Sequence, residues 1–277
     1  MNGGKILIFA DRLNAEMDSL QIKNEVVAYD RGLQLNDLMF KYGLRINADL
    51  VMDLQCDYLP FDVNGNGQFD LLPWNYFPVL ESRSNHPINK NLGFVSGRFV
   101  NSIDTVEAEG IKKTILLSSS VNARKIASPA LISGKENVAA AQDEKFATPN
   151  IPVAVLLEIK FTSLFANRTA QAMRDSIEAY GGSFLPQCIT DNKMIVVADG
   201  DVVLNSVIKG NQPIPMGTNP YTYGTQREFP FANKDFLQNC MDYLINENDL
   251  SEAKGKDYVV RLLDTKKVKE QKTMWQV

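Results

Sequence analysis

The sequence predicts an α/β fold with a mostly parallel sheet flanked by helices, and two passages of the chain carry this pattern. In each passage, apolar runs of strand length alternate with amphipathic segments of helical period. Two of the predicted helices are followed by glycine, which commonly terminates helices. The chain has 277 residues, 44% of them hydrophobic and 22% charged, so it can bury a sizeable core.

The first passage covers residues 5–54. An apolar run at residues 5–10 predicts a buried strand. Apolar side chains then recur at i, i+3, i+4 and i+7 over residues 35–42, and Gly43 follows them, which predicts a short helix. Residues 50–54 form the next apolar run. Strand, helix and strand in this order are the expected start of an α/β fold.

The middle of the chain is less regular. Residues 62–70 are rich in glycine and asparagine and predict a loop or hairpin. Residues 98–106 and 114–118 are expected to be strands.

The second passage begins at Pro152. Residues 153–161 predict a strand with one face that becomes polar toward its end, and residues 170–180 predict a helix that stops at two glycines. Residues 193–198 predict a second buried strand, and residues 258–263 a final strand before a basic tail.

A further helix is predicted over residues 233–246. Asn233 is expected to cap it, and Asp235 in its first turn favours the helix dipole. Its apolar stripe is expected to be buried, with Cys240 acting as a small hydrophobic residue.

A polar, alanine-rich segment at residues 134–145 marks a candidate boundary between two lobes. We therefore expect an α/β lobe with an irregular loop insertion at residues 1–140. A second α/β lobe at residues 141–277 would complete the domain.

Charge and composition exclude several classes of function. The net charge is −4, so the basic surface of a nucleic-acid-binding protein is absent. His86 is the only histidine, which removes multi-histidine metal sites, and three scattered cysteines predict no disulfide framework. The sequence has no GxSxG, P-loop or GxGxxG motif, so we expect no catalytic residues and no cofactor.

The sequence has neither a signal peptide nor an apolar run of the ~18 residues that a membrane span needs. Taken alone, this indicates a cytoplasmic protein, or a fragment of a longer, anchored one.

One segment resembles the first half of a calcium-binding loop. Asp62, Asn64 and Asn66 supply oxygen atoms at positions 1, 3 and 5 of such a loop. Position 12, where a bidentate glutamate belongs, is Pro73, and helical flanks are not predicted. The alternative is a plain polar turn.

A second candidate metal or acid–base site is formed by Asp199 and Asp201. They follow the predicted strand at residues 193–198, and ligands of open α/β sheets bind at the carboxyl ends of strands. Two carboxylates there could hold magnesium or act as an acid–base pair. The alternative is a tight turn, in which aspartate and glycine are common.

Two aromatic segments are candidate contact surfaces. Trp74 and Tyr76 lie among prolines and either form an exposed recognition patch or pack as the lid of a lobe. Tyr221 and Tyr223 belong to a long proline-containing loop, and loops of this length are often functional.

Stretches spread over the whole chain together resemble the GldG family, the auxiliary subunit of a gliding-motility ABC transporter. They are MNGGKILIFAD at 1–11, LLPWNYFPVL at 71–80, HPINKNLG at 86–93, KMIVVADGDVVLN at 193–205, NKDFLQNCMDYL at 233–244 and VVRLLDTKKVKEQKTMWQV at 259–277.

The resemblance implies a domain similar to flavodoxin and the class I glutamine amidotransferases, at the periplasmic face of the inner membrane. It implies anchoring through membrane segments absent from this chain. The implied partners are the ABC permease and ATPase subunits and other envelope proteins, with no nucleic acid. The amidotransferase nucleophile is not expected, because Cys56 is not followed by a helix and His86 is its only possible partner.

The function expected from the sequence is therefore a non-catalytic, substrate-binding-like auxiliary component of an ABC transport system linked to gliding motility. Two alternatives stay open. One is a metal-assisted hydrolase that uses Asp199 and Asp201, and the other is a lobe that binds a small sugar or peptide.

Overall fold

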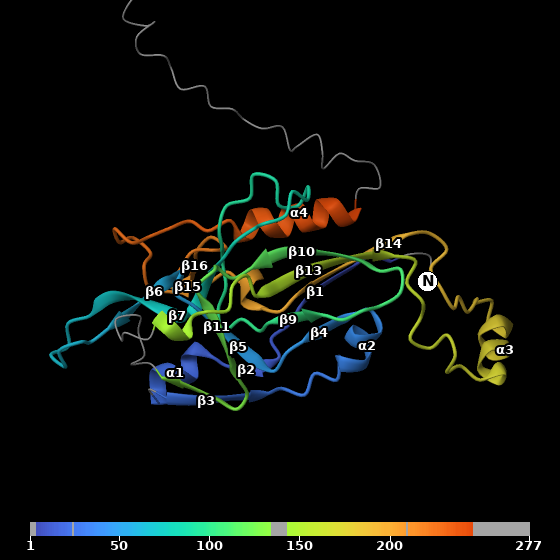
Figure 1. The fold of residues 1–277 in the computed structure, drawn as a ribbon, viewed down its shortest axis with the longest axis horizontal. Coiled ribbons are helices and arrows are strands. Elements are labelled where there is room, and N and C mark those ends of the chain that lie inside the picture. Colours follow the sequence, from blue (N-terminus) through green and yellow to red (C-terminus); the bar gives the residue numbers. More distant parts are fainter. Residues whose placement is uncertain (1–3, 24, 134–142, 209, 246–277) are drawn as a thin grey trace, which may run out of the picture.

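The computed structural model describes residues 4–23, 25–133, 143–208 and 210–245 (Figure 1). A four-stranded mixed sheet lies at its centre. The strand order is β1 (Ile6–Phe9), β14 (Asn192–Val197), β13 (Pro152–Ile159) and β10 (Lys112–Ser118). β1 pairs with β14 in parallel, and the other two pairings are antiparallel.

The remaining pairings among the described residues are antiparallel and belong to small sheets. β5 (Asp49–Asp53) pairs with β11 (Ala123–Ala127), and β4 (Leu44–Ile46) pairs with β9 (Ile103–Thr105). β3 (Glu25–Asp30) lies between β2 (Leu13–Asn14) and β12 (Ala130–Ser133). β7 (Asp70–Leu80) lies between β6 (Cys56–Phe61) and β8 (Val95–Ser96), and β15 (Val207–Ile208) pairs with β16 (Gln212–Pro213).

The helices are few and mostly short. They are α1 (Met17–Lys23), α2 (Asn36–Lys41), α3 (Gln171–Ala179) and α4 (Asn233–Ile245), with 3-10 turns η1 (Asp143–Lys145) and η2 (Asp201–Val203). Among the described residues, no helix combines the length and the apolar character that a membrane span requires.

The prediction of a mostly parallel sheet flanked by helices, similar to flavodoxin or the amidotransferases, is wrong. Parallel neighbours need long crossover connections, usually helical, and only β1 and β14 are paired in parallel in the described chain. The connection from β13 to its antiparallel neighbour β14 carries α3, which projects away from the sheet (Figure 1). The mixed sheet takes strands from both sides of residue 140, while the division into two lobes stays a prediction.

Most of the elements that the sequence predicts are present at the expected residues, although the structure also contains short strands that were not predicted. The apolar runs at residues 5–10, 50–54 and 193–198 form β1, β5 and β14. The helix expected at residues 35–42 is α2, and Gly43 follows it with a φ of +73°, a left-handed conformation that glycine adopts without strain. The strand expected at residues 258–263, and most of the segment at 134–145, lie outside the described residues.

Two predictions in the middle of the chain differ from the structure. The segment at residues 98–106 forms a strand only at β9, Ile103–Thr105. β7 covers a segment for which the sequence predicts no strand, and it contains Pro73 and Pro78, which are unusual inside a sheet. β6 nevertheless pairs with β7 at both prolines, and its register is irregular between Cys56 and Tyr58.

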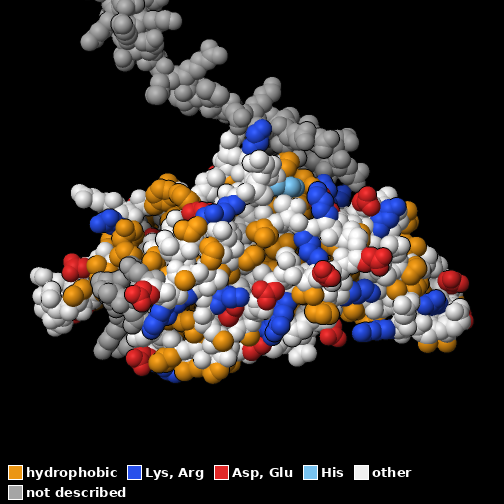
Figure 2. Space-filling model, in the orientation of Figure 1, with side chains coloured by type: hydrophobic (Ala, Val, Ile, Leu, Met, Phe, Trp, Pro, Cys, Tyr) orange, Lys and Arg blue, Asp and Glu red, His pale blue; other side chains and the backbone are white. Residues whose placement is uncertain are grey.

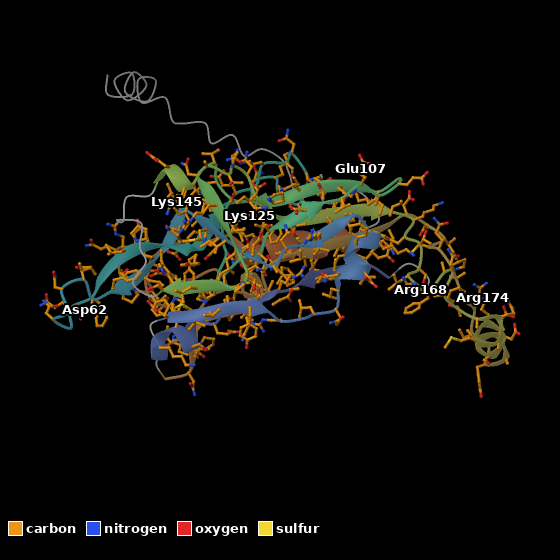
Figure 3. The ribbon with its side chains drawn as sticks, turned by 60° about the horizontal axis from the view of Figure 1, so that its bottom comes forward. Asp62, Glu107, Lys125, Lys145, Arg168 and Arg174 are labelled. Carbon is orange, nitrogen blue, oxygen red and sulfur yellow. The ribbon has the colours of Figure 1, made fainter. Side chains whose placement is uncertain are left out.

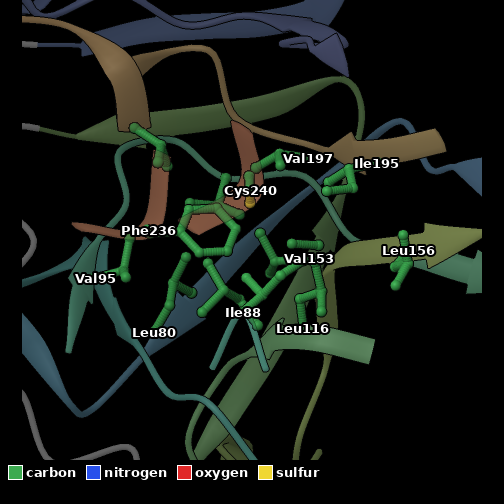
Figure 4. Close-up of a cluster of buried hydrophobic side chains, with 14 of the residues drawn as sticks. Leu80, Ile88, Val95, Leu116, Val153, Leu156, Ile195, Val197, Phe236 and Cys240 are labelled. Atoms are coloured by element: carbon green, nitrogen blue, oxygen red, sulfur yellow. The ribbon is translucent and has the colours of Figure 1, made fainter. Parts of the chain in front are cut away.

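The core lies on both sides of the mixed sheet and beneath the small sheets. In Figure 4, Phe236 and Cys240 of α4 gather with Val153 and Val197 of the sheet, and all four side chains are fully buried. The expected burial of the apolar stripe is confirmed at Phe236, Cys240 and Leu244, whereas Met241 and Ile245 of the same stripe are exposed. A second cluster is aromatic, centred on Trp74.

Asn233 does not act as the expected helix cap. Its side-chain oxygen accepts the N–H of Ser96 at 2.9 Å, and its side-chain nitrogen donates to the carbonyls of Ser96 and Val202. The amide therefore fastens the start of α4 to β8 and η2, because buried backbone groups need partners.

Candidate functional site

Three carboxylates meet at the carboxyl ends of the parallel strands β1 and β14. Asp11 follows β1, and Asp199 and Asp201 follow β14. The N–H of Gly200 donates to Asp11 Oδ1 at 2.7 Å, which ties the two strand ends together. This is the edge at which open α/β sheets bind ligands.

Asp199 holds the turn and is fully buried. Its Oδ1 accepts the N–H of Asp201 at 2.7 Å, and its Oδ2 accepts the N–H of Arg98 at 2.9 Å. Burial raises the pKa of Asp199 well above its usual range, and the charges of Asp201 and Asp11 raise it further. The tight turn expected as one alternative is therefore present, with both carboxylate oxygens bonded to backbone.

Asp201 is less buried than Asp199, and its pKa is unusually high for an aspartate. Burial first, and then the charge of Asp11, raise the pKa of Asp201 to about 6, while Arg98 opposes the shift. In the described part of the chain, no group of three or more histidine, cysteine, aspartate or glutamate side chains is arranged to hold a metal ion. The structure thus brings the two aspartates together without assembling a metal centre around them.

The loop at residues 62–70 is a polar turn between β6 and β7. Asp62 accepts the N–H groups of Asn66 and Gly67 at 3.1 and 3.0 Å, and Asn66 Oδ1 accepts the N–H of Gln68. These oxygen atoms stabilise the turn itself, and the flanks are strands, not the helices of a calcium loop. Figure 3 shows Asp62 at the end of the molecule opposite Arg174.

Trp74 and Tyr76 lie in the interior, as the packed alternative expects. Both are 0% exposed, and the Trp74 ring meets the rings of Tyr76, Phe77 and Phe99 with centroids 5.1 to 5.7 Å apart. They are the aromatic centre of the second core cluster, and no surface for a partner remains on them.

The tyrosines of the long loop differ from each other. Tyr221 is half-buried against the aromatic cluster, whereas Tyr223 is 40% exposed. The loop is fixed by Asn219, whose side-chain nitrogen donates to Asp57 Oδ2 at 2.9 Å and to the Tyr58 carbonyl at 2.8 Å. Of the two, only Tyr223 is available for contact.

Cys56 and His86 do not form a nucleophilic pair. Burial and the charges of Asp53 and Asp57 raise the pKa of the Cys56 thiol, which opposes formation of a thiolate. His86 Nδ1 accepts the N–H of Ile88, and its ring packs on Tyr243 with centroids 4.5 Å apart.

A large cavity that the sequence did not predict lies beside α2. Its volume is about 670 Å³, within the range typical of small-molecule sites. Four segments line it: the turn after β1, α2, β4 and the segment that leads to α3. The lining residues are Arg12, Asn36, Asp37, Phe40, Lys41, Arg45, Leu164, Asn167 and Arg168. Figure 3 shows Arg168 on that segment, between the sheet and α3.

The cations of this cavity fall into two kinds. Arg12 is held by Asp30, Asn36 and the carbonyl of Ile46, and Lys41 Nζ donates to the carbonyl of Ser163 at 2.6 Å. The side chains of Arg45 and Arg168 are exposed, and neither guanidinium forms a hydrogen bond or ion pair with the described residues. No motif signalled this site, because its residues come from segments more than 100 positions apart.

A family model described as an ABC-type uncharacterized transport system matches residues 1–240. No curated protein and no solved structure matches the chain. Because the family match spans most of the 277 residues, the chain belongs to the family of ABC-type uncharacterized transport systems.

Proposed function

We propose that the chain is the extracytoplasmic, non-catalytic auxiliary component of its ABC transport system, and that it works by contact with a permease and an ATPase subunit. The observation that carries the proposal is the family match over residues 1–240, which makes the chain an auxiliary transport component. A position at the periplasmic face of the inner membrane and a link to gliding motility rest on the resemblance to the GldG family.

The bonding of the polar side chains supports a role without turnover. The buried carboxylates of Asp49, Asp53 and Asp57 accept hydrogen bonds from Ser102, Ser120 and Asn219, just as Asp199 accepts from Arg98. These hydrogen bonds join segments that are far apart in the sequence, which gives the carboxylates a structural role. Figure 2 shows positive and negative side chains interspersed on one face.

Affinity capture of the full-length protein from its native envelope tests this proposal. We expect a permease and an ATPase subunit, identified by mass spectrometry, to elute together with the protein in fixed ratio. A matched capture with an unrelated envelope protein of similar size gives the background. Elution without either transporter subunit, under conditions that keep other ABC complexes intact, would contradict the proposal.

A second candidate function is the binding of a small ligand, which fits a substrate-binding-like component. The cavity of about 670 Å³ beside α2 favours it, because it is walled by separate segments and contains polar and apolar side chains. The two functions are compatible, since an auxiliary subunit can carry a ligand to its permease.

A further inference from the structure

We propose that the cavity beside α2 binds a small molecule with two or more negative charges on phosphate or carboxylate groups. The proposal deepens the ligand-binding function proposed above and names its ligand class. It rests on the charges that line the cavity, on the way these side chains are held, and on the apolar surface beside them.

The charge of the cavity is opposite to that of the chain. Four cations line it, namely Arg12, Lys41, Arg45 and Arg168, and Asp37 is the carboxylate among the lining residues. The charge of Arg12 is offset by its ion pair with Asp30, so three cations stand against Asp37. The chain as a whole carries a net charge of −4. Cations gathered around one concave site raise the local concentration of anions, because the field is focused there.

Two of the cations form a fixed wall. The Arg12 guanidinium donates to Asp30 Oδ2 from Nε and Nη2, at 3.0 and 2.9 Å, so its position is set before any ligand enters. Lys41 is likewise fixed by the carbonyl of Ser163. A wall that is already ordered lowers the entropic cost of binding.

The other two cations are available to a ligand. Arg45 extends from β4 and Arg168 from the segment before α3, and neither guanidinium is bonded to a described residue. A guanidinium offers a planar fork of donors that fits phosphate and carboxylate in a bidentate way. Two such forks at one cavity favour a ligand with at least two anionic groups over a single chloride or acetate.

The apolar side chains define the rest of the ligand. Phe40 is 62% exposed although it lies on α2 beside the charged groups, and Leu164 lines the same cavity. An exposed aromatic ring next to cations suits a ligand with a short apolar portion as well as charge. Such a ligand is either a free organic anion or the headgroup of an anionic lipid.

Isothermal titration calorimetry of the full chain with sodium tripolyphosphate tests the proposal. We expect binding that weakens as salt is raised, because exposed charges are screened. Arg45→Gln with Arg168→Gln should weaken binding at least about tenfold, since it removes both free guanidinium groups. Asp37→Asn should strengthen binding, because it neutralises the carboxylate that lines the cavity.

The matched control is Lys90→Gln with Lys234→Gln, which removes the same charge at exposed positions outside the cavity. Equal weakening by both double variants, or no measurable binding at low salt, would overturn the proposal. Sedimentation with phosphatidylglycerol vesicles separates the sources: loss of vesicle binding only in the Arg45/Arg168 variant identifies a lipid headgroup. Tripolyphosphate binding without vesicle binding identifies a free anion. Because calorimetry uses the chain alone, its outcome is independent of the capture of transporter subunits.

Discussion

At the scale of single residues, buried carboxylates in this protein form hydrogen bonds that connect segments far apart in the sequence. Asp53 joins β5 to the chain before β11 through both the hydroxyl and the N–H of Ser120, at 2.6 and 2.7 Å. Asp199 joins the end of β14 to Arg98. Hydrogen bonds to ionised groups are among the stronger ones, which offsets part of the cost of burying the charge.

The carboxylate cluster predicts a dependence of stability on pH. The pKa of Asp201 is about 6 in the folded state, above the ordinary value of about 3.9 in the unfolded chain. The folded state therefore binds the proton more tightly, so this contribution to stability is present below pH ~4 and is lost as the pH rises through about 6. The charged groups that act on Asp201 are Asp11, Glu16, Arg31 and Arg98. Asp201→Asn should flatten the fall in stability between pH 4 and 7 and raise the Tm at pH 8 by a few degrees, about 2–4 °C.

Thermal unfolding followed by circular dichroism at a series of pH values measures this effect. Asp191→Asn, at an exposed position, removes one negative charge away from the cluster and serves as the control. A pH profile of Asp201→Asn that coincides with that of the unmodified chain would show that the carboxylate does not titrate as described.

Gly200 is predicted to be intolerant of a side chain. A Cβ atom at this position would lie 2.7 Å from Asp11 Oδ2, so alanine must displace the carboxylate that binds the Gly200 N–H. Gly200→Ala should destabilise the protein by about 1–3 kcal/mol in urea unfolding. Gly4→Ala, where the added atom meets nothing within 4 Å, should have little effect. Equal stability of the two variants would contradict the tight packing at this turn.

The sequence placed Asp199 and Asp201 correctly after a strand, but it could not show what they bond to. Besides the neighbouring Asp201 N–H, Asp199 bonds to the N–H of Arg98, 101 positions away, and such a distance leaves no local pattern. For the same reason the turn at Asp62 was recognisable, since its partners lie within five positions.

At the scale of elements, α4 is predicted to depend on the buried amide of Asn233. Asn233→Ala would leave the Ser96 N–H and the carbonyls of Ser96 and Val202 without their partner. We expect a loss of about 2–4 kcal/mol in the free energy of unfolding, because buried polar groups are costly to leave unpaired. Asn239→Ala, on the same helix, removes one bond to the Ile88 carbonyl and should cost about 1 kcal/mol. Urea titration of both variants checks this, and a smaller loss for Asn233→Ala than for Asn239→Ala would refute it.

Elements were predictable where burial follows the period of the backbone, but their pairing was not. β13 is an apolar run buried on both faces, which is typical of a parallel strand. Here it lies between two antiparallel neighbours, and it is buried because core clusters cover both faces of the sheet. The hydrophobic pattern is the same in both cases, so the sequence could not distinguish them.

α3 also shows that the hydrophobic pattern does not reveal what an element packs against. Its amphipathic period predicted the helix correctly, yet none of its residues is buried. Met173 on the helix is 62% exposed, and Tyr180, which follows its last residue, is 93% exposed. Periodicity identifies a helix but does not say what, if anything, covers its apolar face.

At the scale of the whole molecule, the fold combines a packed core with a cavity. The cavity is lined by segments that are far apart in the sequence. The mixed sheet is packed by α4 on one side, and the aromatic cluster around Trp74 supports the small sheets. The cavity beside α2 exists only because the turn after β1, β4 and the segment before α3 meet in space. No motif of fixed spacing could reveal it, whereas the membership in a transport family was visible from ordered pieces along the chain.

The central claim is that this chain acts on an ABC transporter by contact, without a reaction of its own. The most direct measurement is the ATPase rate of the permease and ATPase subunits in proteoliposomes, with and without the full-length chain. The account predicts a rate changed at least about twofold and a stable complex of all subunits, while the chain alone turns over no ATP. An unchanged rate together with no complex, at protein concentrations well above those in the envelope, would contradict the account.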